Sequence, residues 1–240
     1  MADRSGQTGG WHNAEKHIIA NEPTRLRRMK YLKSSIGDAK DILEIGCSSG
    51  FMLLPLIKEG KICTGVEPSG MFSDFLRNKG LSVYPSLEVL LDGNPSCRYD
   101  IVMHFFVLEH ISKPLEFLQT QLKLLRPGGK LIFEIPNVAD PLRSIYDVPE
   151  FERFYWSIAH PWYHSESSLS FLLDQLECKY KILRDQRYDL SNHLIWARDG
   201  RPGGMGRFTR FWGLELEDIY KQTLIKSGHC DTLIATVRNR

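Results

Sequence analysis

The segment Gly46-Cys47-Ser48-Ser49-Gly50 has the residue types of a turn that holds a ligand. It follows an apolar run, 41–45, and its glycines allow a close backbone approach that a Cβ would obstruct. A second apolar run, 62–66, ends in Glu67, whose carboxylate is able to accept both hydroxyls of a ribose. The turn and the carboxylate together predict a site for a ligand that contains a ribose.

Several interpretations of this turn compete. The dinucleotide fingerprint GxGxxG fails, because Ser48 stands where the second glycine belongs. The letters also spell GxSxG, the nucleophile elbow of serine hydrolases, but that elbow normally lies well into the sheet and not after its first strand. An adenosyl cofactor, with no phosphate to cradle, fits a neutral turn. A purely structural turn explains the glycines but not Glu67.

The elements that position these residues alternate along the chain. Alternation of short apolar strands with helical stretches predicts right-handed βαβ units and a parallel sheet covered on both faces. The expected strands cover 41–45, 62–66, 83–84, 100–106 and 130–135, and the expected helices cover 11–36, 51–59, 71–78, 87–91 and 114–125.

The alternation breaks after Pro136, where residues 137–168 are rich in proline and aromatic side chains. We expect an inserted cap here, not a second domain. Further on, we expect a helix, a strand, a glycine-rich loop, a helix and a last strand, at 169–175, 180–183, 199–206, 214–225 and 232–237. The predicted organisation is therefore a flexible tail (1–10) and a single domain (11–240), with a ligand-binding half (40–136) and a cap (about 137–215).

Composition excludes several classes of protein. Among 240 residues, 31 Lys and Arg face 29 Asp and Glu, and a net charge of +2 does not favour a nucleic-acid partner. Five cysteines without a CxxC pair argue against a disulfide framework or a zinc knuckle. The apolar runs are much shorter than the roughly 20 residues of a membrane span. With no apolar signal peptide at the polar N-terminus, we expect a cytoplasmic protein.

Four segments in order resemble the class I S-adenosylmethionine-dependent methyltransferases. They are Glu44-x-Gly46-x-Ser48-x-Gly50, Glu67 after the second strand, Tyr99–Pro114, and Leu125–Pro136. The resemblance covers about residues 40–136. It implies a Rossmann-like, seven-stranded, mostly parallel sheet with helices on both faces, an inserted aromatic-rich cap, and methyl transfer from S-adenosyl-L-methionine with S-adenosyl-L-homocysteine as product.

The resemblance also implies roles for individual residues. The turn would approach the methionine part of the cofactor, with Glu44 beneath it, and Glu67 would hold the ribose. Residues after the third strand would flank the adenine, and the end of the fourth strand would lie near the methionine moiety, although core packing is the alternative for its phenylalanines. The implied cofactor-binding residues are Glu44, Gly46, Cys47, Ser48, Gly50, Glu67, Ser86, Leu87, His104 and Phe105.

Histidines are the candidate catalytic bases, since an imidazole pKa near 6.5 suits removal of a proton from an acceptor. His110, in the Glu109-His110 pair after the fourth strand, and His164, in His160-Pro-Trp-Tyr-His164, are the two candidates. A structural role is the alternative for each. We expect no metal at the His160–His164 pair, because Pro161 interrupts it and no carboxylate set accompanies it.

The later segment 159–169 looks similar to bacterial methyltransferases of surface-polysaccharide and sugar-nucleotide pathways. The predicted acceptor is therefore a small molecule, with a hydroxyl of a sugar or sugar nucleotide as the methylated group. A serine hydrolase acting through Ser48 and a non-catalytic S-adenosylmethionine-binding protein are the alternatives. A homo-oligomer is compatible with the sequence.

Overall fold

The computed structural model describes residues 13–238, so the tail expected at 1–10 lies outside the described residues. The described chain forms two compact units. The first unit comprises residues 13–104, 121–131 and 238, and the second unit comprises 105–120 and 132–237.

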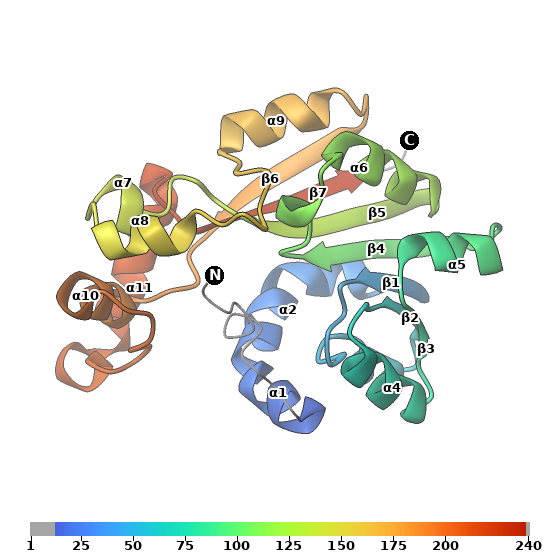
Figure 1. The fold of residues 1–240 in the computed structure, drawn as a ribbon, viewed down its shortest axis with the longest axis horizontal. Coiled ribbons are helices and arrows are strands. Elements are labelled where there is room, and N and C mark those ends of the chain that lie inside the picture. The colour runs from blue at the N-terminus through green and yellow to red at the C-terminus, as the bar shows by residue number, and fades with distance from the viewer. Residues whose placement is uncertain (1–12, 239–240) are drawn as a thin grey trace. The chain divides into compact units, whose positions relative to one another are not determined.

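Seven strands form one sheet in the order β3-β2-β1-β4-β5-β7-β6 (Figure 1). β1 pairs in parallel with β2 and with β4, and β2 pairs in parallel with β3. The expected seven-stranded, mostly parallel sheet with helices around it is confirmed. The strands are β1 (Asp41–Ile45), β2 (Ile62–Val66), β3 (Ser82–Tyr84), β4 (Tyr99–Phe105), β5 (Leu125–Pro136), β6 (Lys179–Asp185) and β7 (Thr232–Arg238).

The register aligns the carboxyl ends of three strands in the first unit. Ile45 of β1 lies beside Val66 of β2 and beside His104 of β4. Strands β1 and β4 are buried on both faces, as their mostly apolar sequence favours in a parallel sheet. The glycine turn after β1 and Glu67 after β2 therefore follow neighbouring strands at one edge of the sheet.

Helices of the first unit surround this part of the sheet, with α4 beside β3. They are α1 (Ala14–Ala20), α2 (Glu22–Ile36), α3 (Leu53–Lys58), α4 (Gly70–Asn78) and α5 (Leu87–Gly93). The single helix expected over 11–36 is wrong, because the chain breaks at Asn21. Its side-chain amide donates to the His17 carbonyl at the end of α1, and Pro23 sits in the first turn of α2, where a missing N–H costs little.

Strand β5 begins earlier than the sequence indicated. Helix α6 (Pro114–Lys123) ends two residues before the expected Leu125, and β5 begins at Leu125, not Lys130. The reason is that the Leu124 carbonyl already accepts a hydrogen bond from Tyr99 N at 2.8 Å, so the backbone joins β4 before the glycines are reached.

The second unit contains the aromatic-rich region 137–168, and it forms helices that the sequence did not predict. Three unexpected helices, α7 (Pro141–Ser144), α8 (Pro149–Tyr155) and α10 (Leu190–Asp199), pack around Leu142, Val148, Phe151 and Trp196. Pro141 and Pro149 occupy first-turn positions, so these prolines start helices instead of breaking them.

The expected cap range of 137–215 also contains α9 (Glu166–Asp174) and β6, an edge strand of the sheet. The helices that are not part of the βαβ pattern thus lie on both sides of β6 along the chain. The last helix, α11 (Thr209–Ser227), begins five residues before the expected Leu214 and is kinked at Gly213.

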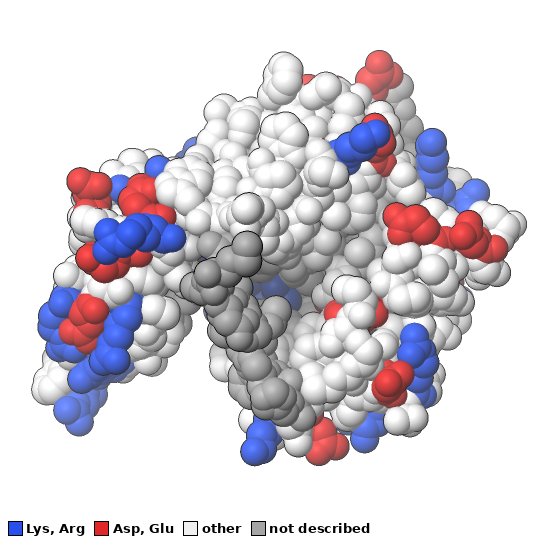
Figure 2. Space-filling model, in the orientation of Figure 1, with Lys and Arg blue, Asp and Glu red and all other residues white. Residues whose placement is uncertain are grey.

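The surface drawn in Figure 2 mixes positive and negative side chains. Several of them form ion pairs three residues apart, such as Arg77 with Asp74 and Arg153 with Glu150. Within residues 13–238, no helix is both long enough and apolar enough to cross a membrane.

Candidate functional site

The glycine turn after β1 needs its glycines. Gly46 and Gly50 both have φ +73°, in the left-handed region that a Cβ disfavours. A Cβ on Gly50 would also lie 2.5 Å from Leu76 Cδ2 of α4. The N–H groups of Gly46 and Cys47 both donate to the Val66 carbonyl, at 2.8 and 3.1 Å, which ties the turn to the end of β2.

Ser48 connects the turn to the carboxylate of Glu67, which the sequence singled out. Ser48 has φ +50° without being glycine, and its N–H donates to Glu67 Oε2 at 2.7 Å. Ser69 N–H donates to Glu67 Oε1 at 2.8 Å. Strained backbone of this kind is held by its surroundings and is enriched at functional sites.

Glu67 keeps acceptor capacity after these two contacts. A carboxylate offers about four acceptor positions, and the backbone occupies two of them. Burial raises the pKa of Glu67, and the N–H groups of Ser69 and Ser48 work in the opposite direction. The residues present therefore fit a ligand that donates two hydroxyl hydrogen bonds, as a ribose does.

Glu44 lies within β1 and is buried. Burial raises its pKa to about 8, while the nearby charge of Arg28 lowers it. Within residues 13–238, its Oε2 atom has no hydrogen-bond partner. The strand before the turn thus carries a buried carboxyl oxygen without a partner among the described residues, and a cofactor role for Glu44 stays a prediction.

His17 was not expected from the sequence. From α1, its Nδ1 lies 2.8 Å from the Ser49 hydroxyl, and its ring packs against Phe51 and Phe72. Asn21 holds the other ring nitrogen at 3.1 Å. His17 lies 32 positions from Ser49 along the chain, and no local pattern signals this contact.

Ser86 and Leu87 lie where β3 leads into α5. The Ser86 hydroxyl accepts a hydrogen bond from Val89 N at 3.3 Å and caps the helix, which gives it a structural role. Leu87 is buried. Their contribution to an adenine site stays a prediction.

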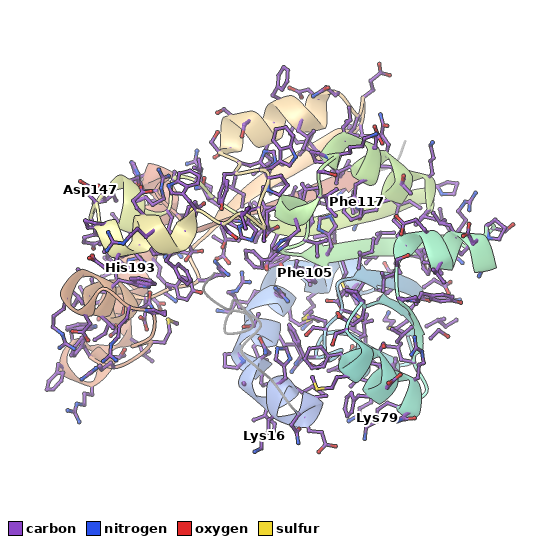
Figure 3. All side chains as sticks on the ribbon, in the orientation of Figure 1. Lys16, Lys79, Phe105, Phe117, Asp147 and His193 are labelled. Atoms are coloured by element: carbon purple, nitrogen blue, oxygen red, sulfur yellow. The ribbon has the colours of Figure 1, made fainter. Side chains whose placement is uncertain are left out.

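Cys47, His104 and Phe105 are buried. Burial raises the pKa of the Cys47 thiol and lowers that of His104 to about 3, so the histidine is neutral at pH 7. Phe105 ends β4, as Figure 3 shows. A cofactor role for these three residues also stays a prediction.

In the second unit, the chain turns sharply after β4. Phe106 has φ +58°, and its N–H donates to the Glu134 carbonyl at 2.9 Å. The Arg187 guanidinium lies over its ring, 4.2 Å from the centroid. A non-glycine residue held in this conformation points to a constrained turn, and the short 3-10 helix η2 (Leu108–His110) follows directly.

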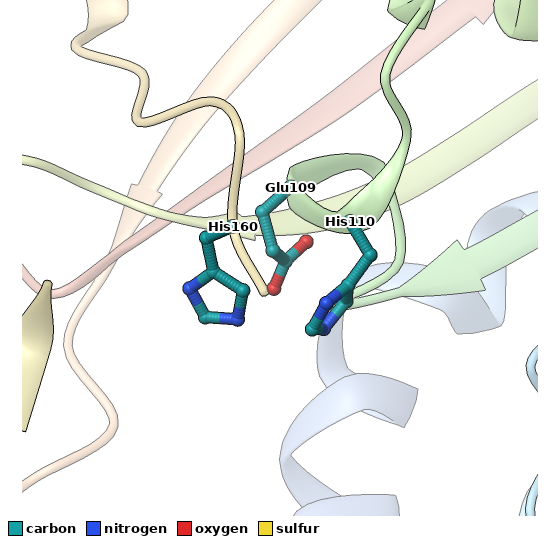
Figure 4. A group of neighbouring side chains, drawn as sticks. All are labelled: Glu109, His110 and His160. Atoms are coloured by element: carbon teal, nitrogen blue, oxygen red, sulfur yellow. The ribbon is translucent and has the colours of Figure 1, made fainter. Parts of the chain in front are cut away.

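This turn brings Glu109 and His110 next to His160 (Figure 4). One ligand atom from each of the three side chains lies within 4.8 Å of the others. The two imidazole rings meet edge to face, with centroids 4.4 Å apart. Glu109 is buried, and burial raises its pKa to about 8.

Two contacts hold the loop that carries His160 against the turn. The His110 Nδ1–H donates to the Ala159 carbonyl at 3.0 Å, and Trp162 Nε1 donates to the Ser112 carbonyl at 3.1 Å. Tyr163 packs edge to face on His160 and donates its hydroxyl to the Tyr155 carbonyl at 3.0 Å.

His164, the other expected base, is not a member of this cluster. It is buried, with Nδ1 3.4 Å from the Ser168 hydroxyl, and burial lowers its pKa. A catalytic role for His164 stays a prediction. The expectation of no metal considered His160 with His164, whereas the structure groups His160 with His110 and supplies a carboxylate from Glu109.

The GxSxG interpretation requires a histidine at Ser48. Within residues 13–238, the Ser48 side chain makes no hydrogen bond with a histidine, and His17 contacts Ser49 instead. Ser49, which does contact a histidine, is fully buried, whereas the nucleophile of such an elbow is exposed.

Comparison with known proteins gives a family match over most of the chain. The model of the family described as "Methyltransferase domain" matches residues 12–180. The chain is 31% identical over 137 residues to a ubiquinone biosynthesis O-methyltransferase of Coxiella burnetii, covering 53% of this chain and 56% of that protein. The chain thus spans about half the length of the curated relatives it matches.

Solved structures share the fold at low sequence identity. A SAM-dependent methyltransferase from Archaeoglobus fulgidus superposes with a TM-score of 0.61 at 17% identity, covering 95% of both chains. The plantazolicin methyltransferase BpumL, solved with SAH, has a TM-score of 0.58 at 18% identity, covering 98% of this chain and 93% of that one.

Proposed function

Because this chain belongs to the methyltransferase domain family, we propose that it transfers a methyl group from S-adenosylmethionine to a hydroxyl of a small-molecule acceptor. The observation that carries the proposal is Glu67, which follows β2, is held by two backbone N–H groups and keeps acceptor positions for a ribose.

When bound, S-adenosylmethionine supplies a methyl group that is already electrophilic. The chain therefore has to bind the cofactor, orient the acceptor and remove a proton from the acceptor. Glu67 accepts the ribose hydroxyls, and the glycine turn allows the backbone to come close to the ligand. The N–H groups of Ser48 and Ser69 hold the Glu67 carboxylate in place before the ligand binds. Little side-chain entropy of Glu67 is therefore lost on binding.

The acceptor must lose a proton when it is a hydroxyl, and His110 is the residue that we propose handles it. Its imidazole is exposed on the turn after β4, and Ala159 orients it. A sugar or sugar-nucleotide hydroxyl, expected from the segment 159–169, stays a prediction, since none of the relatives named above is described as a sugar methyltransferase.

We further infer that residues 11–240 work as one methyltransferase domain in the cytoplasm, with a cap that chooses a small molecule as acceptor. The family match runs across both units, which supports this organisation. The net charge of +2 supports a small acceptor over a nucleic acid.

Calorimetry with S-adenosylmethionine and S-adenosylhomocysteine tests the proposal. We expect Glu67→Ala to weaken binding about 100-fold, because two hydrogen bonds to a charged group are worth roughly 3 kcal/mol or more. The exposed Glu59→Gln is the matched control and should bind as the wild type does. Absence of binding by the wild type would contradict the proposed function.

A further inference from the structure

Glu109 and His160 join His110 in a donor set, although a base for the proposed methyl transfer needs His110 alone. Two imidazoles and one carboxylate are the protein ligands of catalytic zinc sites and of other divalent transition-metal sites with open positions. Such ligand atoms lie about 2.0–2.2 Å from the metal. One ligand atom from each of the three groups lies within 4.8 Å of the others, which is close enough for the groups to share one ion.

The hydrogen bond from His110 to Ala159 selects the tautomer that a metal ligand needs. The Ala159 carbonyl only accepts, so the hydrogen bond from Nδ1 at 3.0 Å places the ring proton on Nδ1. In the neutral ring, the lone pair therefore lies on Nε2. Metal-binding histidines typically donate their second ring N–H to a backbone carbonyl or carboxylate in this way.

Glu109 offers a carboxylate oxygen that the protein itself does not use. The side chain is 3% exposed, and its Oε2 has no hydrogen-bond partner among residues 13–238. A buried carboxylate is costly unless a proton, a cation or hydrogen bonds satisfy it. Arg187 attracts its charge and Glu134 repels it, so the surroundings only partly compensate it.

The loop that carries His160 is held in place before any ligand binds. Trp162 and the Ala159 carbonyl fasten it to the turn at His110, and Tyr163 packs on the His160 ring. A preorganised set of this kind binds a metal more tightly, because less side-chain entropy is lost on binding.

We propose that Glu109, His110 and His160 bind a divalent transition-metal ion and that, if the proposed function holds, this ion binds the acceptor hydroxyl. Three protein ligands leave coordination positions for oxygen atoms of the acceptor. Coordination lowers the pKa of the hydroxyl, and its proton passes to water. In that case His110 acts as a ligand of the ion, which replaces the role of proton acceptor given to it above.

The ion also narrows the class of acceptor. A molecule with two neighbouring oxygen donors, such as a catechol or a vicinal diol, occupies two open positions and is bound more tightly than a single hydroxyl. Both a phenolic ring and a sugar offer this pair of oxygens, and the paired test compounds are catechol and phenol, and a vicinal diol and its deoxy analogue.

Co²⁺ titration of the metal-free wild-type protein is the first test. We expect about one equivalent to bind, with visible d–d absorption and paramagnetically shifted exchangeable imidazole N–H signals from two histidines. Failure to bind, or a spectrum without histidine ligands, overturns the proposal. This measurement needs no variant.

Variants then assign the ion to these residues. Glu109→Gln and His160→Gln, on two different segments, should each weaken Co²⁺ binding at least about 10-fold, because losing even a hydrogen-bond partner of a metal ligand typically costs about 10–100-fold. His229→Asn is the control, because His229 contacts Ser144 and lies outside the cluster. If folded Glu109→Gln and His160→Gln, checked by circular dichroism, bind Co²⁺ as the wild type does, the assignment is wrong.

Binding of S-adenosylmethionine, measured in the presence of EDTA, separates this inference from the proposed function. Cofactor binding without Co²⁺ binding overturns the metal site alone. Co²⁺ binding without cofactor binding overturns the proposed methyl transfer and leaves the metal site standing. Catechol or diol that shifts the Co²⁺ spectrum, where phenol or the deoxy analogue does not, supports the acceptor class, and equal shifts contradict it.

Discussion

The two units build their sites by different physical means. In the first unit, the turn at Gly46–Gly50 uses backbone N–H groups and left-handed φ angles, and Glu67 is positioned by main-chain donors. In the second unit, Glu109, His110 and His160 meet through their side chains. A site made from backbone tolerates many side-chain changes but few changes of conformation, whereas a site made from side chains behaves in the opposite way.

The largest expected effect concerns the conformation of the glycine turn. Gly50→Ala should lower the free energy of unfolding by about 2–5 kcal/mol, because a Cβ at φ +73° is strained and would meet Leu76 Cδ2 at 2.5 Å. Gly60→Ala, at φ +84° with no atom within 4 Å of its Cβ, should cost only about 1–2 kcal/mol. Urea unfolding measures both losses. Equal losses would contradict the claim that the contact with Leu76 makes Gly50→Ala the more destabilising change.

A second effect compares a buried histidine in each unit. Burial lowers the pKa of His104 to about 3 and that of His193 to about 4. Below pH 6.5 the unfolded chain takes up a proton that the folded chain does not, so the stability present above pH 6.5 is lost as pH falls towards the folded pKa. Figure 3 labels His193, which lies in α10.

The measurement is the difference in unfolding free energy between the wild type and each of His104→Leu and His193→Gln, taken from pH 7 to pH 4.5. Subtracting the variant cancels the opposite trend of the buried carboxyl groups. For either histidine, the wild type should lose about 1.4 kcal/mol of unfolding free energy relative to the variant for each pH unit below 6.5. A difference independent of pH would mean that the histidine takes up its proton at the same pH in the folded and unfolded chains, so that its pKa is not lowered by burial.

The smallest effect on cofactor binding is expected at Ser48, because its backbone N–H, and not its side chain, donates to Glu67. Ser48→Gly keeps the donor to Glu67 and suits φ +50°, so the Kd for S-adenosylmethionine should change less than about threefold. Calorimetry measures it beside Glu67→Ala. A loss as large as that of Glu67→Ala would show that the hydroxyl takes part, and the contrast between the two units would fail. A serine hydrolase would instead lose its activity in Ser48→Gly.

Several parts of the fold were predictable because their signals are local. Strands β1 and β2 match the expected 41–45 and 62–66, since strands of a parallel sheet are short segments rich in apolar residues. Helices α7, α8 and α10 were missed, because prolines there start helices and aromatic side chains pack against one another instead of following a simple helical period. The early start of β5 was missed because pairing with β4 overrides the turn signal of its glycines.

The sequence by itself determined strands β1 and β2, the glycine turn and the position of Glu67, because these residues are neighbours along one βαβ unit. Only the tertiary structure decided that His17 contacts Ser49, 32 positions away, and that His160 joins Glu109 and His110. His110 and Ala159, which fix that second arrangement, are 49 positions apart. The physical reason is that backbone conformation is encoded locally, whereas the meeting of distant side chains depends on how a whole unit packs.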